Sequence, residues 1–259
     1  MRYQRVVAGV DDSEAGVAAA RLGWNLAKMT GAECHLVHVS ADVSAMPATL
    51  PVSARLDELM EHVQAGARNK ITERLAGAIP DDAVEQVRIE MGRAAWVLPN
   101  YVRKVKGSLL VLGGKHHLAP TRWFGGSTAH HAVRTLDVPT VIAVPSKPTI
   151  ERIAVATDLS HASRLVLEEA ERLARMFHAE LRAIHVVEQI PYYAEYPVII
   201  DHSTFVSWSE NRFDDVLKGS LQDPEIDSVV LSGAPANSIA EQVDLWHADL
   251  LVVGSHGKS

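Results

Sequence analysis

The segment RVVAGVDDS at residues 5–13 decides the fold, because it recurs as RIAVATDLS at residues 152–160. Each copy is a short apolar run that ends in Asp-x-Ser, a pattern typical of a buried parallel strand followed by a turn. At the same offset of 147 residues, 11 of the 35 positions from residue 5 to residue 39 are identical. A second block, LLVLG at residues 109–113, recurs as LLVVG at residues 250–254. The two blocks keep their order, so the sequence predicts one domain written twice.

A Pro-rich segment at residues 145–148 separates the copies. We therefore expect two domains, at residues 1–146 and 149–259. After Gly113 the first copy continues through a Gly-rich segment, a helix and a strand, whereas the second copy stops at Ser259. It lacks about 27 residues that the first copy predicts. We expect the second domain to be incomplete at its C-terminus, as in a truncated chain; a naturally short copy is the alternative.

The first copy predicts five strands that alternate with four helices. The strands are expected at residues 6–10, 34–39, 84–91, 109–112 and 139–144, and the helices at residues 13–31, 52–78, 94–106 and 127–136. In the first helix, Ala18, Leu22, Leu26 and Met29 follow a 3.6-residue period and predict its core face. The alternation predicts an α/β fold with an open, doubly wound parallel sheet in each copy. Such sheets bind ligands beyond the carboxyl ends of their strands, where the strand order reverses.

The composition excludes several classes of protein. Of the 259 residues, 47% are hydrophobic and 22% are charged, which is ordinary for a domain with a core. The apolar runs are far shorter than the ~18 residues of a membrane span, and the start of the chain lacks a secretory signal, so we expect a cytoplasmic protein. The net charge of −7 disfavours binding to nucleic acid or to anionic membranes. The single cysteine, Cys34, excludes an internal disulfide and favours a buried apolar role.

Polar residues follow the first strand of each copy. Asp11 and Ser13 in the first copy, and Asp158 and Ser160 in the second, lie where a carboxylate can accept hydrogen bonds from a ribose. The alternative is that these residues only cap the helix that follows.

A Gly-rich segment follows the fourth strand of the first copy. Its glycines allow a ligand to approach the backbone closely, and the helix after it offers free N–H groups and a dipole that favour an anion. These features predict a phosphate cradle; the alternative is a Gly-rich loop with an ordinary serine cap. The candidate residues are Gly113, Lys115, Gly126, Ser127 and Thr128.

These motifs resemble those of the universal stress protein family, in its tandem form. The adenine-nucleotide loop of that family reads Gly, two residues, Gly, nine residues, Gly, then Ser or Thr. Gly113, Gly126 and Ser127 fit this spacing, with His116 in place of the second glycine, and Gly254 and Gly257 begin the same pattern in the second copy. The resemblance implies two five-stranded sheets of the adenine-nucleotide alpha-hydrolase-like, Rossmann-like type, the second one incomplete.

The resemblance also implies a ligand and a site. The ligand would be ATP or another adenine nucleotide, with Mg as its optional companion. Asp11 would bind ribose, the backbone of Val39 would contact adenine, and the loop residues would hold the phosphates. The second-copy equivalents are Asp158, Val186, Gly254, His256 and Gly257. His116 could block the phosphates or hydrogen-bond to them, so a complete second copy is the better candidate and the binding copy stays open.

Two further function classes remain open. The pair of copies could be a nucleotide-free structural or partner-binding module in which the domains pair within the chain, with a homodimer as a further form. A slow ATP hydrolase is the other alternative, although the sequence contains no pattern that identifies a catalytic base. The histidines at residues 116–117 and 130–131 are expected to be exposed rather than metal ligands, because no acidic partner lies nearby in the sequence. The helical pair at 130–131 would supply one ligand at most, since adjacent helical residues diverge by ~100°.

Overall fold

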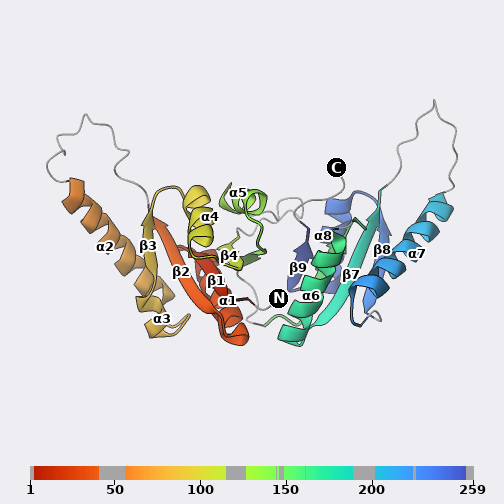
Figure 1. Ribbon diagram of the computed structural model, residues 1–259, viewed down its shortest axis with the longest axis horizontal. Coiled ribbons are helices and arrows are strands. Elements are labelled where there is room, and N and C mark those ends of the chain that lie inside the picture. Colours follow the sequence, from red (N-terminus) through yellow and green to blue (C-terminus); the bar gives the residue numbers. More distant parts are fainter. Residues whose placement is uncertain are drawn as a thin grey trace, which may run out of the picture. The chain divides into compact units, whose positions relative to one another are not determined.

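The computed structural model describes residues 3–40, 56–114, 127–143, 145, 149–160, 162–188, 202–223 and 226–254. The described residues divide into two compact units: unit 1 contains those up to residue 145, and unit 2 contains those from residue 149 onwards. Each unit contains one parallel sheet with helices packed against it (Figure 1).

Unit 1 contains a five-stranded sheet in the order β3-β2-β1-β4-β5, and every neighbouring pair is parallel. The order reverses between β1 and β4, which confirms the predicted doubly wound fold. The elements are β1 (Arg5–Val10), α1 (Glu14–Thr30), β2 (Glu33–Ser40), α2 (Leu56–Leu75), α3 (Asp81–Glu85), β3 (Arg88–Met91), α4 (Ala94–Lys104), β4 (Leu109–Gly113), α5 (Ser127–Thr135) and β5 (Thr140–Ala143).

Unit 2 repeats this topology with four strands in the described residues, in the order β8-β7-β6-β9. The register of β6 on β9 joins Ile153 to Leu250, and the register of β1 on β4 joins Val6 to Leu109, so the two repeat blocks pair in the same way. The elements are β6 (Arg152–Thr157), α6 (Ser163–Phe177), β7 (Glu180–Val187), α7 (His202–Ser220), β8 (Asp227–Ser232), α8 (Pro235–Trp246) and β9 (Leu250–Val253).

Helices cover both faces of the sheet in unit 1. On one face, α4 and α5 pack on alternate residues of the strands, including Val7, Val37 and Leu110, which are buried. On the other face, α1 lies against β1 and β4, and α2 lies against β2. Gly23 brings α1 so close to the sheet that a Cβ there would stand 2.8 Å from the Cβ of Ala8. The pocket described below lies on this α1/α2 face.

Two local predictions are wrong. Residues 81–85 form a helical turn, so the third strand begins at Arg88 rather than at residue 84. The acidic pair that follows Pro80 begins that turn, and the turn buries Val84 on the core as a strand would have done. In α1, Met29 is 47% exposed, because the small residues Ala19, Gly23 and Ala27 lie against the sheet instead.

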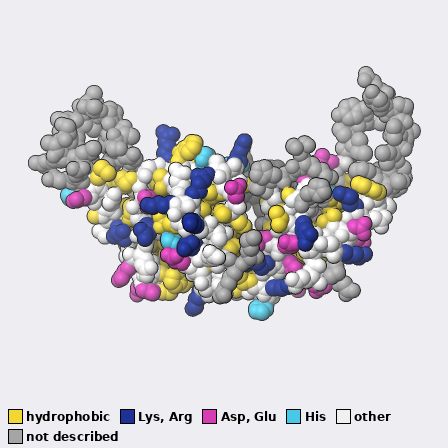
Figure 2. Space-filling view, viewed as in Figure 1, with side chains coloured by type: hydrophobic (Ala, Val, Ile, Leu, Met, Phe, Trp, Pro, Cys, Tyr) yellow, Lys and Arg dark blue, Asp and Glu magenta, His cyan; other side chains and the backbone are white. Residues whose placement is uncertain are grey.

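The next features are the distribution of charged side chains, the apolarity of the helices and the burial of Cys34. Basic and acidic side chains are mixed over the face that Figure 2 shows. No helix in the described part of the chain has the length and apolarity to span a bilayer. Burial raises the pKa of the Cys34 thiol to about 12, which keeps it protonated as an apolar group.

Candidate functional site

The turn after β1 fixes Asp11 at the start of α1. The Ser13 N–H donates to Asp11 Oδ1 at 3.1 Å, and the Ser13 hydroxyl also donates to Oδ1. Ser13 Oγ accepts from the Gly16 N–H at 3.0 Å, which makes Ser13 the N-cap of α1. The capping interpretation is therefore confirmed for Ser13, and it leaves Asp11 exposed at the positive end of the helix.

Strand β4 ends against the same turn. A Cβ on Gly113 would stand 2.7 Å from the carbonyl carbon and oxygen of Ala15, so a side chain cannot fit there. The Gly114 N–H donates to the Ala143 carbonyl at 2.7 Å, which extends the pairing of β4 with β5. The carboxyl ends of β1 and β4 thus meet the N-terminus of α1 with backbone packed on backbone, at the point where the strand order reverses.

The end of β2 completes this edge of the sheet. The pairing of β1 with β2 stops at Val10 and His38, so Val39 lies beyond the last paired residue of β1. His38 donates from Nδ1 to the Val10 carbonyl at 2.9 Å, because a carbonyl can only accept. When the ring is neutral, its Nε2 is an acceptor. Val39 is half-buried on the α4/α5 side.

The same edge in unit 2 differs at its turn. Asp158 Oδ1 accepts from the Ser160 N–H at 2.9 Å and from the Ser163 hydroxyl at 3.0 Å. The N-cap of α6 is Ala162, with no side-chain cap, so Ser160 does not repeat the role of Ser13. His185 does repeat the role of His38, since its Nδ1 donates to the Thr157 carbonyl at 2.9 Å.

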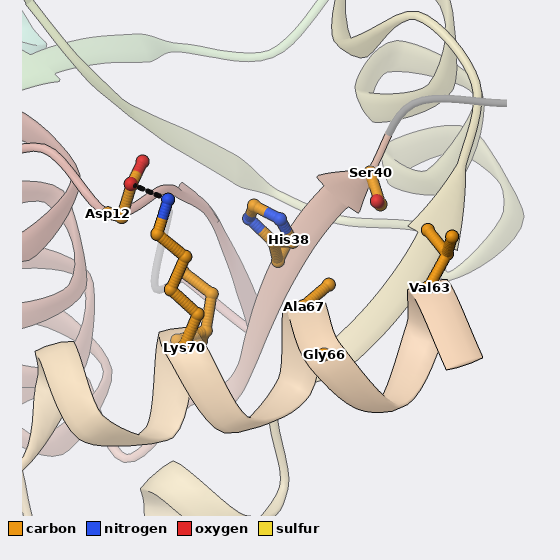
Figure 3. A pocket seen from close by; sticks show the side chains of 8 residues that line it. Asp12, His38, Ser40, Val63, Gly66, Ala67 and Lys70 are labelled. Carbon is orange, nitrogen blue, oxygen red and sulfur yellow. Dashed lines mark ion pairs between the residues drawn. The ribbon is translucent and has the colours of Figure 1, made fainter. Parts of the chain in front are cut away.

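A pocket of about 300 Å³ opens beside this edge in unit 1, between β2 and α2 (Figure 3). Lys70 on α2 reaches across to the Asp12 carboxylate as an ion pair, which Figure 3 marks with a dashed line. The nearby ammonium lowers the pKa of Asp12 below its usual value. The lining residues are Asp12, His38, Ser40, Val63, Gly66, Ala67, Lys70 and Ile71.

Comparison with known proteins identifies the family. The model of the Universal stress protein family matches residues 2–144 and again residues 149–259. The chain belongs to the universal stress protein family. The two matches confirm the tandem form that the repeat predicts.

Individual universal stress proteins are distant relatives. Universal stress protein A homolog 1 of Coxiella burnetii (strain RSA 493 / Nine Mile phase I) is 28% identical over 111 residues, which are 41% of this chain and 77% of that protein. The crystal structure of a universal stress protein from Archaeoglobus fulgidus DSM 4304 matches with a TM-score of 0.62 and 14% identity, over 95% of this chain and 85% of that one. At that identity the likeness shows the shared fold. A universal stress protein crystallised with cAMP matches 40% of this chain and 76% of its own, at 20% identity and a TM-score of 0.28.

The structure brings part of the predicted universal stress protein site together. Asp11, Ser13, Val39 and Gly113 lie at one edge of unit 1, and α5 begins there with Ser127 and Thr128 as its first residues. In unit 2, Asp158, Ser160, Val186 and Gly254 occupy the same edge of the second sheet. The remaining predicted residues lie outside the described part of the chain: Lys115, His116, Gly126, His256 and Gly257.

Sequence reasoning missed the pocket and its ion pair. The sequence shows only a run of small residues, Ala65-Gly66-Ala67, in a helix otherwise rich in long side chains, and this run does not say which side of the helix faces the sheet. The described His131 packs on Trp96, with ring centroids 4.2 Å apart, and no three His, Cys, Asp or Glu side chains of the described residues come together as metal ligands.

Proposed function

We propose that this universal stress protein binds an adenine nucleotide, foremost ATP, at the carboxyl edge of the unit 1 sheet, and that it acts in stress responses through protein partners. One observation carries the proposal: Asp11, Gly113 and the N-terminus of α5 share the edge where the strand order reverses. This is the place where doubly wound sheets bind nucleotides.

The residues present suit the ligand chemically. Gly113 lets the end of β4 pack directly on the Ala15 backbone, which brings this sheet edge and the N-terminus of α1 together as one surface for a ligand. The Asp11 carboxylate is exposed and is oriented by Ser13, as an acceptor for ribose hydroxyls should be. The first N–H groups of α5 have no partner within their own helix and attract phosphate.

The first test identifies the bound molecule. The purified chain is denatured, the released small molecules are identified by mass spectrometry, and ATP is then titrated by calorimetry with and without Mg²⁺. We expect ATP binding that Asp11→Ala weakens ~10-fold or more, because a hydrogen bond to a charged group contributes about 1.5–3 kcal/mol. Asp137→Ala is the matched control, since Asp137 is exposed and precedes β5 at the opposite edge of the sheet.

No nucleotide in the purified protein and no heat with ATP would refute the proposal. The protein would then be a structural or partner-binding module, in which the two units pair within the chain or a second copy binds. Release of phosphate from ATP, measured in the same samples, would favour the slow hydrolase instead.

A further inference from the structure

The helices α2 and α7 each follow the second strand of their unit, so they occupy equivalent places in the fold. Their buried residues show which positions of the two helices correspond. Ile71, Leu75 and Ile79 are 1%, 0% and 6% exposed in unit 1. Phe213, Leu217 and Leu221 are 1%, 2% and 7% exposed in unit 2. The last members, Ile79 and Leu221, lie just beyond their helices, and matching the three buried positions in order gives an offset of 142. The first two strands of each unit and the turn after the first strand keep the offset of 147.

This alignment shows that the pocket in unit 1 is packed core in unit 2. Ile71 at the pocket corresponds to Phe213, whose ring lies 5.8 Å from the His185 ring. Asp12 and Ser40 correspond to Leu159 and Val187, which are 4% and 2% exposed. His185 is itself buried, whereas its counterpart His38 is half-buried and lines the pocket.

The comparison has a physical consequence. Apolar side chains can fill this place in the fold, and filling it stabilises the unit by removing apolar surface from water. Unit 1 instead lines it with a carboxylate, a hydroxyl and an ammonium group beside the apolar Val63 and Ile71. A hollow with both apolar and polar lining in place of core suits a ligand, and its volume is at the lower end of the range for small-molecule sites.

The charges of the pocket define which part of a ligand it suits. Lys70 pairs with Asp12, so the two charges offset each other and the pocket offers little net attraction for a phosphate. The neutral His38 ring presents Nε2 as an acceptor, and the Ser40 hydroxyl donates or accepts. Val63, Ala67 and Ile71 present apolar surface. This combination fits an uncharged, flat group that carries hydrogen-bond donors.

We infer that unit 1 is the nucleotide-binding half of the chain, that its pocket receives the uncharged nucleoside end of the nucleotide, and that Phe213 closes the equivalent place in unit 2. The inference rests on the proposed function. It assigns to Ile71 and Phe213 the difference between the two units, and it places the nucleoside against His38 and Ser40 in the pocket, with the phosphates towards Gly113.

The test fills the pocket with larger side chains and measures binding of the nucleoside end and of the phosphate end of the nucleotide separately. Ile71→Phe copies unit 2, and Ala67→Leu fills the same space from a half-buried position. Calorimetry measures ATP, adenosine and inorganic tripolyphosphate on the 259-residue chain. The wild type is expected to bind about one ATP per chain. Either variant is expected to weaken ATP binding at least ~10-fold and to abolish adenosine binding, while tripolyphosphate binding stays within ~2-fold.

Matched controls come from unit 2. Lys70→Met, which removes the ion pair at the pocket, is expected to weaken adenosine binding, whereas Arg212→Met at the equivalent position of α7 is expected to change nothing. Thermal unfolding checks that each variant is folded. Two ATP per wild-type chain, or unchanged adenosine binding in both pocket-filling variants, would overturn the inference and leave the proposed function standing. A wild type that binds no ATP would overturn both.

Discussion

A single methyl group at Gly113 tests how the candidate site is built. Gly113→Ala places a Cβ 2.7 Å from two backbone atoms of Ala15, whereas ordinary contacts begin at 3.4 Å. Both atoms belong to the main chain, so no rotamer change can relieve the overlap. The end of β4 and the start of α1 must therefore move apart by several tenths of an ångström or more.

The magnitude follows from two opposing effects. Overpacking of a well-packed site costs about 1–3 kcal/mol. Replacing glycine by alanine restricts the unfolded chain and returns about 0.4–1 kcal/mol. The overpacking is larger, so we expect Gly113→Ala to lower the free energy of unfolding by about 1–2 kcal/mol.

Gly66→Ala is the control with the opposite sign. Gly66 lies within α2, and a Cβ there meets no atom within 4 Å. Alanine in a helix interior is more favourable than glycine by about 0.5–1 kcal/mol, so this variant should be more stable than the wild type. Urea unfolding followed by circular dichroism measures both. If Gly113→Ala matches the wild type, or if both substitutions shift stability in the same direction, the close packing of β4 on α1 is refuted.

Three further predictions concern single side chains. Phe213→Ala should lower the stability of unit 2 by about 3–5 kcal/mol in urea unfolding, and Trp208→Ala, at an exposed position on the same helix, should change it by less than about 0.5 kcal/mol; equal effects would contradict the packing. Ser13→Ala should cost about 1 kcal/mol in thermal unfolding through loss of the α1 cap, and an unchanged melting temperature would show that Ser13 does not cap. The pKa of Cys34, raised by burial to about 12, predicts that stability falls as pH rises from about 9 towards 12, because the unfolded thiol ionises first; at pH 8 a thiol reagent should react much faster after unfolding than before, and equal rates would contradict the burial.

The fold was readable from the sequence because its signals are local and repeated. Apolar runs such as residues 6–10 and 109–112 predict buried parallel strands, and both form. The third strand was misplaced because Val84 and Val87 are apolar and buried in either conformation, so the residue pattern alone does not separate a helical turn from a strand. The core face of α1 was predicted correctly at Leu26, which is 1% exposed, and wrongly at Met29, because small residues such as Gly23 and Ala27 pack on the sheet instead.

The candidate site was only partly readable. Asp11, Ser13 and Gly113 come from chain segments whose place at the sheet edge follows from topology, so sequence could place them together. The pocket could not be predicted, because it depends on which side of α2 faces β2 and on how closely the helix approaches. Asp12 and Lys70 are 58 residues apart in the chain, and no periodic pattern connects them.

The turn after the first strand of each unit shows how the two copies have diverged. Leu159, at the position of Asp12, is buried and adopts φ of +59°, a backbone conformation that costs a non-glycine residue about 1–3 kcal/mol. Burial of a leucine side chain contributes about 1.5–3 kcal/mol, which offsets that strain. The same turn delays the start of α6 to Ser163, whereas α1 begins directly after Ser13. Unit 2 thus accepts backbone strain to place an apolar side chain in its core, while unit 1 keeps an unstrained turn with an exposed carboxylate at the mouth of a pocket. This difference in a nine-residue motif is what a change from ligand binding to structural support would require.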